Sequence, residues 1–380
     1  MQVGFSATTL QGGRTGVARY VIRLLDALAR VPGAPRMDRV VRRGEEHLLP
    51  EGSGQQSVYR LARWHRGPVC DIAWHQVRLG RLARERRWDL VHVPTLRRLP
   101  GRCPCPVVAT VHDLAAFRLA GKYGGLRTFY NRRVVPRLLK SVNHVITPSE
   151  ATKRDLVSLL GMDGNRISVI FQGIDGEQFH PGPREAARKA LLPHLALPNE
   201  FLLYVARLEH PGKNHVRLLE AMAELRRSAG LEIPVVLAGA PWRQADVIDE
   251  AVKRLGLERC VVFAGFVPDA WLPDLYRACS ALVFPSLFEG FGFPPLEAMS
   301  CGRPVVCSRA GSLPEVVGDA AELVDPESSD DIARGIAAVV TSPNWSDELV
   351  RRGLRQAAPY QWQSTARQTL AVYEGVVSQN

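Results

Sequence analysis

The amino-acid sequence predicts two α/β domains in tandem, each a doubly wound parallel sheet of the Rossmann type. Three observations lead to this fold class. At 380 residues the chain exceeds the size of most single hydrophobic cores, so two domains of roughly 150–200 residues are expected. Short apolar runs alternate with segments of helical spacing, as in successive βαβ units. Proline and glycine cluster in FHPGPREA, residues 179–186, which predicts a boundary between a domain over 1–183 and a second from 184.

The second half shows the alternation of strands and helices clearly. Its strands are predicted at five apolar, β-branched runs: 201–206, 234–239, 260–265, 281–285 and 304–308. These runs lack polar alternation, which is typical of parallel strands covered by helices on both faces. Helical spacing follows in the segments 214–230, 243–256 and 269–280.

The first half repeats the scheme less regularly. Strands are predicted at 1–6, 89–93, 106–112, 143–149 and 167–171. Helices are predicted at 16–30, 73–87, 126–140 and 149–161. Pro136 should kink the third helix, and residues 32–67 are rich in loop formers, so no strand is assigned there. Two such domains leave a cleft between them, and in such sheets ligands bind beyond the carboxyl ends of the strands.

Composition narrows the functional classes. Apolar residues make up 46% of the chain and charged residues 23%, as in an ordinary globular protein. No apolar run reaches the roughly 18–20 residues of a spanning helix, and the first residues lack a secretory layout. We therefore expect a cytoplasmic protein.

Neither a metal nor a cofactor is expected. The seven cysteines are scattered, and the close pair Cys103-Pro-Cys105 has no second pair at zinc-site spacing. The sequence contains no P-loop and no Asp-x-Asp motif, so it gives no support for a metal at a nucleotide phosphate. Reduced thiols in apolar surroundings are the better interpretation.

The pair Glu289 and Glu297 is the strongest chemical signal. The two carboxylates flank the segment GFGFPPL, which joins a predicted strand to a helix beginning near Pro294. Gly290 and Gly292 allow the backbone to approach a ligand, at the positive end of that helix. Carboxylates suit paired hydroxyls and N–H groups suit phosphate, so the segment predicts a site for a sugar attached to a phosphate. The alternative for Glu297 is a carboxylate in the first turn that offsets the helix dipole.

Three further groups follow predicted strands. Arg207 and Lys213 lie on one loop and could clamp a diphosphate, although solvated surface cations are the alternative. His112 follows a strand and could bond a substrate or transfer a proton, unless it is a structural histidine. Gly16 opens a helix in GGRTGVARY, which lacks the G-x-G-x-x-G spacing of a dinucleotide fingerprint.

These motifs together resemble a known family. E-x7-E within EGFGFPPLEAM, VARLEHPGKNHVRLLEAM, VHDL, ITPSEATKRDL and YQWQSTARQTLAVYEGV are similar to the retaining glycosyltransferases of family 4, which have the GT-B fold. The resemblance covers nearly the whole chain and is densest from 200 to 326. It implies a donor domain over 184–362 and an acceptor domain over 1–183, against which a helix at 363–380 packs. The sequence departs from the family pattern at two places. Thr15 replaces the first glycine of a frequent pair, and Phe171-Gln172-Gly173 replaces a usual Asn-Gly.

The resemblance also implies a role for each candidate residue. Arg207 and Lys213 would bind the donor's diphosphate, and Glu297 would hold the ribose. Glu289 would hold the transferred sugar, with His112 as a second contact. The remaining donor contacts implied are Gly16 for the phosphates, Val267 in the turn 265–268 for the nucleobase, and the backbone of Phe291, Gly292 and Phe293 for the sugar.

The implied activity is a metal-independent, retaining hexosyl transfer from a nucleoside-diphosphate sugar to a glycan or lipid-diphosphate-linked acceptor. GDP-mannose is the first expectation for the donor and a UDP-hexose the next. Two alternatives remain from the sequence: an epimerase acting on nucleotide sugars with the same fold, and a scaffold that has lost catalysis.

Charge is unequal between the predicted domains. Residues 1–183 hold 29 Lys and Arg against 14 Asp and Glu, whereas the remainder holds 20 against 24. The first domain could therefore meet an anionic membrane surface, although solvated helix faces are the alternative. Nucleic acid is not expected, because no base-reading module is present. The basic and aromatic residues concerned are Arg60, Arg63, Trp64, Arg66, Trp74, Arg78, Arg81, Arg84, Arg86, Arg87 and Trp88, and then Arg127, Arg132, Arg133, Arg137 and Lys140.

Overall fold

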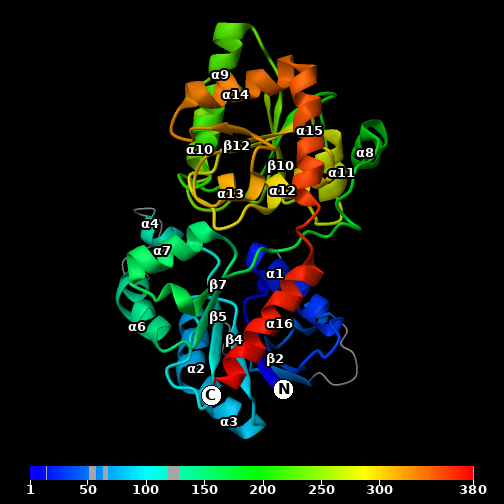
Figure 1. Ribbon diagram of the computed structural model, residues 1–380. Coiled ribbons are helices and arrows are strands. Elements are labelled where there is room, and N and C mark those ends of the chain that lie inside the picture. Colours follow the sequence, from blue (N-terminus) through cyan, green and yellow to red (C-terminus); the bar gives the residue numbers. More distant parts are fainter. Residues whose placement is uncertain (14, 51–56, 63–66, 119–127, 380) are drawn as a thin grey trace. The chain divides into compact units, whose positions relative to one another are not determined.

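The computed structural model describes residues 1–13, 15–50, 57–62, 67–118 and 128–379 (Figure 1). The chain divides into two units, one formed by Met1–Gly173 with Gln361–Asn380 and the other by Ile174–Tyr360. The chain passes from the first unit to the second after Gly173, earlier than the boundary predicted in the Pro- and Gly-rich segment 179–186. The reason is that Ile174 and Phe179 are buried in the core of the second unit.

The first unit contains a seven-stranded sheet in the order β3-β2-β1-β4-β5-β6-β7, with every pairing parallel. Its strands are β1 (Gln2–Ser6), β2 (Arg36–Arg42), β3 (Ser57–Leu61), β4 (Leu90–Val93), β5 (Val107–Thr110), β6 (His144–Thr147) and β7 (Ile167–Val169). The order reverses beside β1, as expected of a doubly wound sheet.

Two strands of this sheet, β2 and β3, lie in the segment to which the sequence analysis assigned none. The apolar run of β2 is interrupted by Asp38 and Arg39, yet both residues are buried. The Asp38 carboxylate accepts hydrogen bonds from Trp88 Nε1 at 2.7 Å and Gln2 Nε2 at 3.2 Å. Arg39 donates to the Pro50 carbonyl at 2.8 Å. Such partners offset the cost of burying charge, and none of them can be read from local sequence.

The helices of the first unit differ in part from the predicted ones. The segment 73–87 forms two helices that meet at Arg78, and a π-helical turn at Tyr130–Val134 precedes the proline at 136. The α-helices are α1 (Gly16–Ala29), α2 (Pro68–Val77), α3 (Leu79–Arg86), α4 (Ala115–Arg118), α6 (Val135–Lys140), α7 (Glu150–Leu160) and α16 (Trp362–Ser378). Helix α16 packs against α1, with Trp362 and Tyr20 6.1 Å apart between ring centroids.

Two of the three tryptophans expected beside the surface arginines, Trp74 and Trp88, are not on the surface. Trp74 and Trp88 are both buried in the core of the first unit, because their large rings fill space between helices and sheet. The arginines of α3 that surround them in sequence remain exposed. Arg63, Trp64, Arg66 and Arg127 lie outside the described residues.

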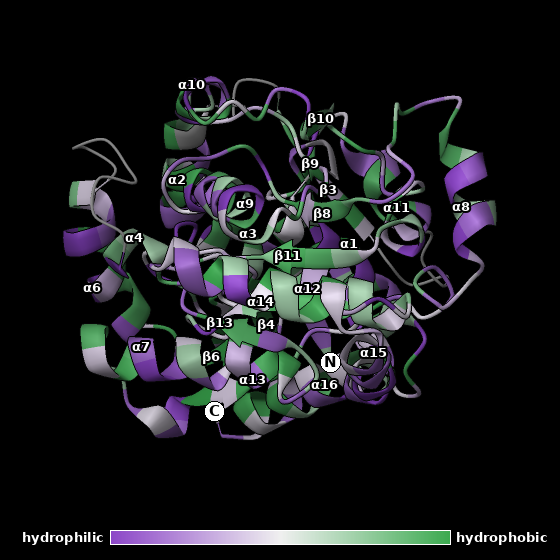
Figure 2. Ribbon diagram, turned by 90° about the horizontal axis from the view of Figure 1, so that it is seen from above, coloured by the Kyte–Doolittle hydropathy of each residue, from purple (hydrophilic) through white to green (hydrophobic). Residues whose placement is uncertain are grey.

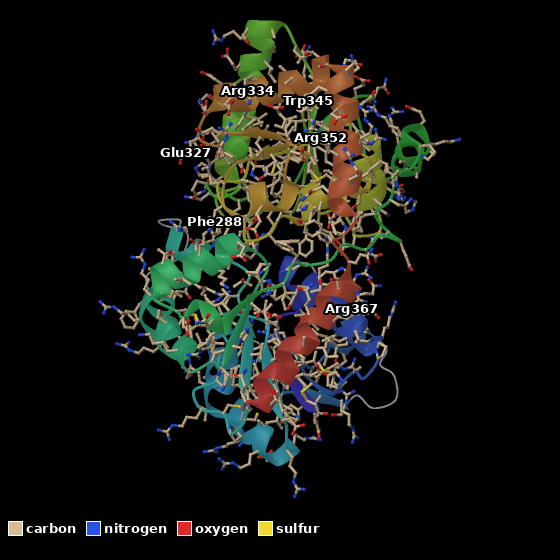
Figure 3. The ribbon with its side chains drawn as sticks, in the orientation of Figure 1. Phe288, Glu327, Arg334, Trp345, Arg352 and Arg367 are labelled. Atoms are coloured by element: carbon tan, nitrogen blue, oxygen red, sulfur yellow. The ribbon has the colours of Figure 1, made fainter. Side chains whose placement is uncertain are left out.

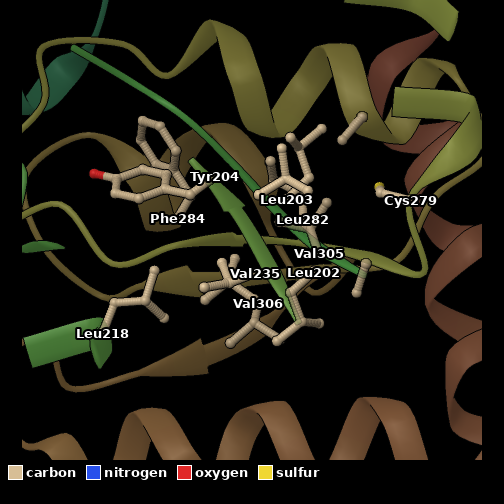
Figure 4. Packing of buried hydrophobic residues seen from close by; sticks show 14 of the residues in the cluster. Leu202, Leu203, Tyr204, Leu218, Val235, Cys279, Leu282, Phe284, Val305 and Val306 are labelled. Carbon is tan, nitrogen blue, oxygen red and sulfur yellow. The ribbon is translucent and has the colours of Figure 1, made fainter. Parts of the chain in front are cut away.

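The second unit contains a six-stranded parallel sheet in the order β10-β9-β8-β11-β12-β13. Its inner strands are almost entirely apolar. Their side chains belong to one buried cluster with Leu218 of α9 and Cys279 at the end of α11 (Figure 4). Strand β11 is hydrophobic along its length, whereas helix α8 is largely hydrophilic (Figure 2). The strands are β8 (Leu202–Val205), β9 (Val235–Ala238), β10 (Val261–Gly265), β11 (Ala281–Phe284), β12 (Val305–Ser308) and β13 (Glu322–Val324).

Helices cover this second sheet in the predicted alternation. On α15, Trp345 donates to Glu322 at 2.9 Å and lies 5.5 Å from the Arg352 guanidinium (Figure 3). The helices are α8 (Arg184–Leu191), α9 (His215–Ala229), α10 (Asp246–Arg254), α11 (Leu272–Ala278), α12 (Phe293–Ser300), α13 (Leu313–Val317), α14 (Ser329–Thr341) and α15 (Pro343–Ala357). Among the described residues of both units, no helix is both long and apolar enough to cross a membrane.

Candidate functional site

The strand order of the second unit brings two predicted segments together. The order reverses at β8, which pairs with β9 on one side and β11 on the other. Loops that follow adjacent parallel strands leave the sheet at the same edge, and such a reversal is where α/β sheets bind ligands. The loop after β8 carries Arg207 and Lys213, and the loop after β11 carries Glu289.

Lys213 and Glu289 form an ion pair across these two loops. The distance from Lys213 Nζ to Glu289 Oε1 is 2.6 Å, and the side chains are 19% and 18% exposed. The backbone of both loops is fixed: the Lys213 carbonyl accepts from the Tyr204 hydroxyl, and the Glu289 carbonyl accepts from Ser312 Oγ at 3.0 Å. The pair is therefore partly shielded from water and held in one geometry.

The glycine-rich loop after Glu289 adopts a conformation that requires glycine at one position. Gly292 has φ of 122°, which L side chains rarely adopt, whereas Gly290 lies outside the left-handed region. Ser312 Oγ also donates to the Phe291 carbonyl at 2.8 Å. A Cβ at Gly311 would lie 2.6 Å from the Glu289 carbonyl oxygen, so close packing of two loops sets this shape. Phe291 is buried, and its ring meets that of Phe293 at 5.3 Å.

Glu297 is a buried carboxylate, 2% exposed. Helix α12 begins at Phe293, so Glu297 lies one residue beyond the first turn in which it was expected. Its Oε2 accepts a hydrogen bond from the buried Tyr276 hydroxyl of α11 at 2.7 Å. This partner fixes the direction of the carboxylate, and it could not be found from the sequence, where Tyr276 reads as one more apolar residue of a helix.

Arg207 is held by an acid and an aromatic ring. Its Nη2 lies 3.3 Å from Glu209 Oε2, and its guanidinium carbon lies 5.0 Å from the centre of the Trp242 ring. The backbone N–H of Trp242 donates to the Leu208 carbonyl at 3.0 Å. This bond extends the β8–β9 pairing into the loops and places the Trp242 ring beside Arg207. The Arg207 side chain is nevertheless 45% exposed and can reach a ligand.

Val267 is buried in the turn after β10. Gly265 in this turn has φ of 64°, and its carbonyl accepts from the Gly239 N–H at 2.7 Å. The turn is thereby joined to the loop after β9.

His112 belongs to the first unit, two residues beyond β5. Its Nδ1 lies 3.1 Å from Gln172 Nε2, and its ring meets the edge of the Tyr20 ring at 4.7 Å. Burial lowers its pKa to about 4, so the ring is uncharged at neutral pH. Asp113, next in sequence, accepts from the Ala115 N–H at 2.9 Å and caps a short helix.

Gly16 is the first residue of α1. Its neighbour Thr15 is the N-cap and accepts from the Ala18 N–H at 3.1 Å. The first-turn N–H groups of an α-helix point out of its N-terminus, and the Thr15 cap accepts from one of them.

No cluster of three or more metal-binding side chains occurs in the described parts of the chain. The thiols of Cys103 and Cys105 lie 3.7 Å apart and are free. Cys260, Cys279 and Cys307 are buried, in agreement with their apolar surroundings in the sequence.

Comparisons with known proteins identify the family. Residues 14–178 match the family model described as Glycosyltransferase Family 4, and residues 193–356 match Glycosyl transferases group 1. The O-antigen chain mannosyltransferase B of Escherichia coli is 30% identical over 98% of this chain and 100% of its own. The chain belongs to glycosyltransferase family 4. This glycosyltransferase is an enzyme of the retaining hexosyltransferase class, as the sequence resemblance implied.

Other relatives support the same family and fold. The MMP alpha-(1->4)-mannosyltransferase of Mycolicibacterium hassiacum is 29% identical to the glycosyltransferase over 72% of this chain and 66% of its own. Sucrose-phosphate synthase from Thermosynechococcus elongatus superimposes with a TM-score of 0.82 at 21% identity, covering 100% of both chains. Anabaena HepE in complex with UDP and glucose gives 0.77 at 20% identity, covering 99% of this chain and 100% of its own. The two parallel sheets are those of the GT-B fold, and that prediction is confirmed.

Proposed function

We propose that the enzyme transfers mannose from a nucleoside-diphosphate sugar, with GDP-mannose as the first candidate, to a hydroxyl of a glycan or lipid-diphosphate-linked acceptor. The sugar is supported by the relatives: O-antigen chain mannosyltransferase B, the serotype-specific mannosyltransferase WbdA of Escherichia coli and the mycobacterial mannosyltransferase. A UDP-hexose is the second candidate, because HepE was solved with UDP and with UDP-glucose.

The ion pair between Lys213 and Glu289 carries the proposal. A cation and a carboxylate on adjacent loops match a donor in which a diphosphate is attached to a hydroxyl-rich sugar. In our proposal Lys213 and Arg207 bind the diphosphate, Arg207 through its planar fork and Lys213 as a point charge. Glu289 turns its carboxylate to the sugar hydroxyls, with His112 as a second sugar contact.

The remaining donor contacts are proposed from the loops around this pair. The Glu297 carboxylate, directed by Tyr276, accepts from the ribose hydroxyls. The further contacts proposed are the backbone of Phe291, Gly292 and Phe293 for the sugar, Val267 for the nucleobase and Gly16 for the phosphates.

The proposed chemistry is retention through attack on one face. The bond between the anomeric carbon and the phosphate oxygen breaks, and the acceptor oxygen forms its bond to that carbon on the same face. The leaving phosphate oxygen takes the acceptor proton. Lys213 and Arg207 stabilise the charge that develops on the diphosphate, which is where fixed cations contribute most to a rate.

The test begins with thermal unfolding in the presence of GDP, UDP, ADP and their sugars, without added metal. Ligand binding raises the unfolding temperature by mass action, so a rise with GDP and GDP-mannose alone would support the first donor. The nucleotide sugar that binds is then incubated with acceptor, and free nucleoside diphosphate is measured. Release would support transfer, whereas conversion of the sugar without release would support the epimerase alternative. No shift with any nucleotide would contradict the donor assignment.

We also propose that the first unit meets an anionic membrane that carries the acceptor. Helix α2 exposes Val69 and Val77, which are 79% and 62% exposed, and Phe129 is 62% exposed. Gln76 donates to the Tyr130 hydroxyl at 2.9 Å, so α2 and the segment beginning at Phe129 are neighbours. The exposed cations between α2 and Lys140 in these two segments are Arg78, Arg81, Arg84, Arg86, Arg87, Arg132, Arg133, Arg137 and Lys140. Exposed apolar side chains on elements that also carry exposed cations suit an anionic lipid surface.

Liposome sedimentation tests the membrane proposal. The enzyme should bind vesicles rich in phosphatidylglycerol at low salt and should not bind neutral vesicles. The double variant Val77→Ser/Phe129→Ser should bind less, while Leu354→Ser, at an exposed apolar residue of the second unit, should bind as the wild type does. Absence of binding to anionic vesicles at low salt would overturn the proposal.

A further inference from the structure

We propose that Gln172 is a positioning residue for His112: its side-chain amide holds Nδ1 of the ring and thereby leaves Nε2 as an N–H donor for the substrate. This inference rests on the proposed function of His112 as a contact to the transferred sugar. Gln172 stands where the family resemblance places an Asn-Gly pair, and it was not among the candidate residues from the sequence.

The contact itself defines the roles of the two ring nitrogens. Gln172 Nε2 and His112 Nδ1 are 3.1 Å apart, and an amide nitrogen can only donate, so in this orientation of the amide Nδ1 is the acceptor. In an uncharged imidazole the proton then resides on Nε2. That Nε2 is buried and has no hydrogen-bond partner within the described residues. A buried donor without a partner is costly, and a sugar hydroxyl would satisfy it.

Gln172 has little freedom to leave this contact. The residue is 2% exposed, and the backbone on both sides is fixed by the start of α16. The Phe171 carbonyl accepts from Thr365 Oγ1 at 2.8 Å. A Cβ at Gly173 would lie 2.1 Å from the backbone nitrogen of Trp362, so only glycine allows the chain to pass so close. Helix α16 thus holds the residue that holds His112.

The surroundings of His112 keep the ring uncharged, so the tautomer decides what it can do. Burial lowers the pKa of His112 to about 4, against smaller opposing effects of the Asp113 carboxylate and the Pro94 carbonyl. Tyr20, on α1, donates to or accepts from Thr110 at 3.0 Å, and burial raises its pKa. Burial lowers the pKa of His92, on β4, to about 3. Tyr20 and His92 are therefore uncharged at neutral pH.

Two substitutions at 172 separate positioning from simple packing. Gln172→Leu removes the amide, and kcat/KM should fall by about fivefold to thirtyfold, the factor for one buried hydrogen bond. Gln172→Glu provides a carboxylate that can only accept, so Nδ1 must become protonated and the pKa of His112 should rise. Transfer by Gln172→Glu should then decline as pH rises through that new value, because the uncharged ring would carry its proton on Nδ1 and present a bare Nε2. The pH profile of the wild-type enzyme should show no such decline.

The tautomer of His112 can be determined by NMR, without an activity measurement. In a two-bond proton–nitrogen correlation spectrum of enzyme labelled with ¹⁵N-histidine, the His112 signal is the one absent from His112→Gln. The wild type should show the form protonated on Nε2, and Gln172→Glu should show protonation of Nδ1. Gln368→Glu, an exposed glutamine on α16, serves as the control and should leave the signal unchanged.

The outcomes distinguish this inference from the proposed function. A wild-type ring protonated on Nδ1, or a signal unaffected by Gln172→Glu, would overturn the positioning role. If the spectrum behaves as expected while His112→Gln transfers sugar at the wild-type rate, the positioning role stands and the assignment of His112 to the sugar fails.

Discussion

At the scale of single residues, the candidate site of the second unit pairs a cation, Lys213, with a carboxylate, Glu289. Lys213 and Glu289 form an ion pair at 2.6 Å. Either charge alone would be partly buried without a partner, which is costly. A donor that carries both negative phosphates and hydroxyls can take over both halves of the pair. The two charges therefore suit a ligand that offers a partner to each.

Lys213→Ala should reduce transfer by about a hundredfold to a thousandfold, since a fixed group that stabilises transition-state charge is removed. Initial rates of nucleoside-diphosphate release measure this effect, and circular dichroism checks that the fold is retained. Lys189→Ala, at an exposed lysine of α8, is the matched control and should transfer at the wild-type rate. An active Lys213→Ala enzyme would refute the diphosphate assignment.

Tyr276→Phe should raise the KM for the donor by about fivefold with kcat little changed. The substitution removes the hydroxyl that donates to Glu297 at 2.7 Å, and one hydrogen bond is worth about 1 kcal/mol. Steady-state kinetics with varied donor separate the two constants. An equal loss in kcat would show instead that Glu297 acts on the transition state.

Sequence reasoning proposed the charged residues of this candidate site but not the side chains that contact them. Arg207, Lys213 and Glu289 were selected because they are charged and lie in loops that follow apolar strands. Tyr276 and Trp242 were not found, because an aromatic residue in a helix or a loop has the same local pattern whether it packs or directs a neighbour. Only the tertiary structure shows that each contacts a charged side chain.

At the scale of elements, the loop between β11 and α12 depends on one glycine. Gly292→Ala should reduce transfer at least tenfold and lower the unfolding temperature by a few degrees. A residue with a Cβ at φ of 122° is strained by roughly 1–3 kcal/mol, and the added atom would lie 2.7 Å from Leu313 Cδ2. Gly176→Ala is the matched control in the same unit, because nothing lies within 4 Å of its Cβ. Equal rates for the two variants would contradict a special role for the loop.

The elements that the sequence predicted share one property. Strands such as β8, β9 and β11 are uninterrupted apolar runs, so their burial is legible in the sequence. Strand β2 was missed because Asp38 and Arg39 are buried with distant partners. The helix predicted at 73–87 is divided at Arg78, next to Gly80, whose Cβ would lie 2.0 Å from the Arg102 carbonyl oxygen. Close approach of a distant loop is likewise invisible in a local pattern.

At the scale of the whole molecule, buried histidines should make the enzyme sensitive to mild acid. Burial lowers the pKa of His92 and His215 to about 3 and that of His112 to about 4. In the unfolded chain these groups titrate near 6.5 and bind protons that the folded chain does not. The contribution of these histidines to the free energy of unfolding should therefore be constant above about pH 7 and fall as pH decreases from 6.5, by about 2 kcal/mol per histidine at pH 5.

Urea unfolding at several pH values measures this loss. Because the chain has two units, each transition is analysed separately. His92 and His112 belong to the first unit and His215 to the second, so both transitions should shift. A His215→Phe variant should flatten the pH dependence of the second transition alone. Stability that is unchanged between pH 7 and 5 would contradict the prediction.

The division into units also fixes the order in which the molecule can be completed during synthesis. Unit two, Ile174–Tyr360, is continuous in the chain, whereas unit one depends on α16, which follows it. Synthesis therefore completes Ile174–Tyr360 before it reaches the residues of α16. Until then, Gln172 lacks the helix that clamps it, and the proposed sugar contact at His112 is unfinished. The nascent chain would thus reach transfer competence only after α16 has emerged and docked.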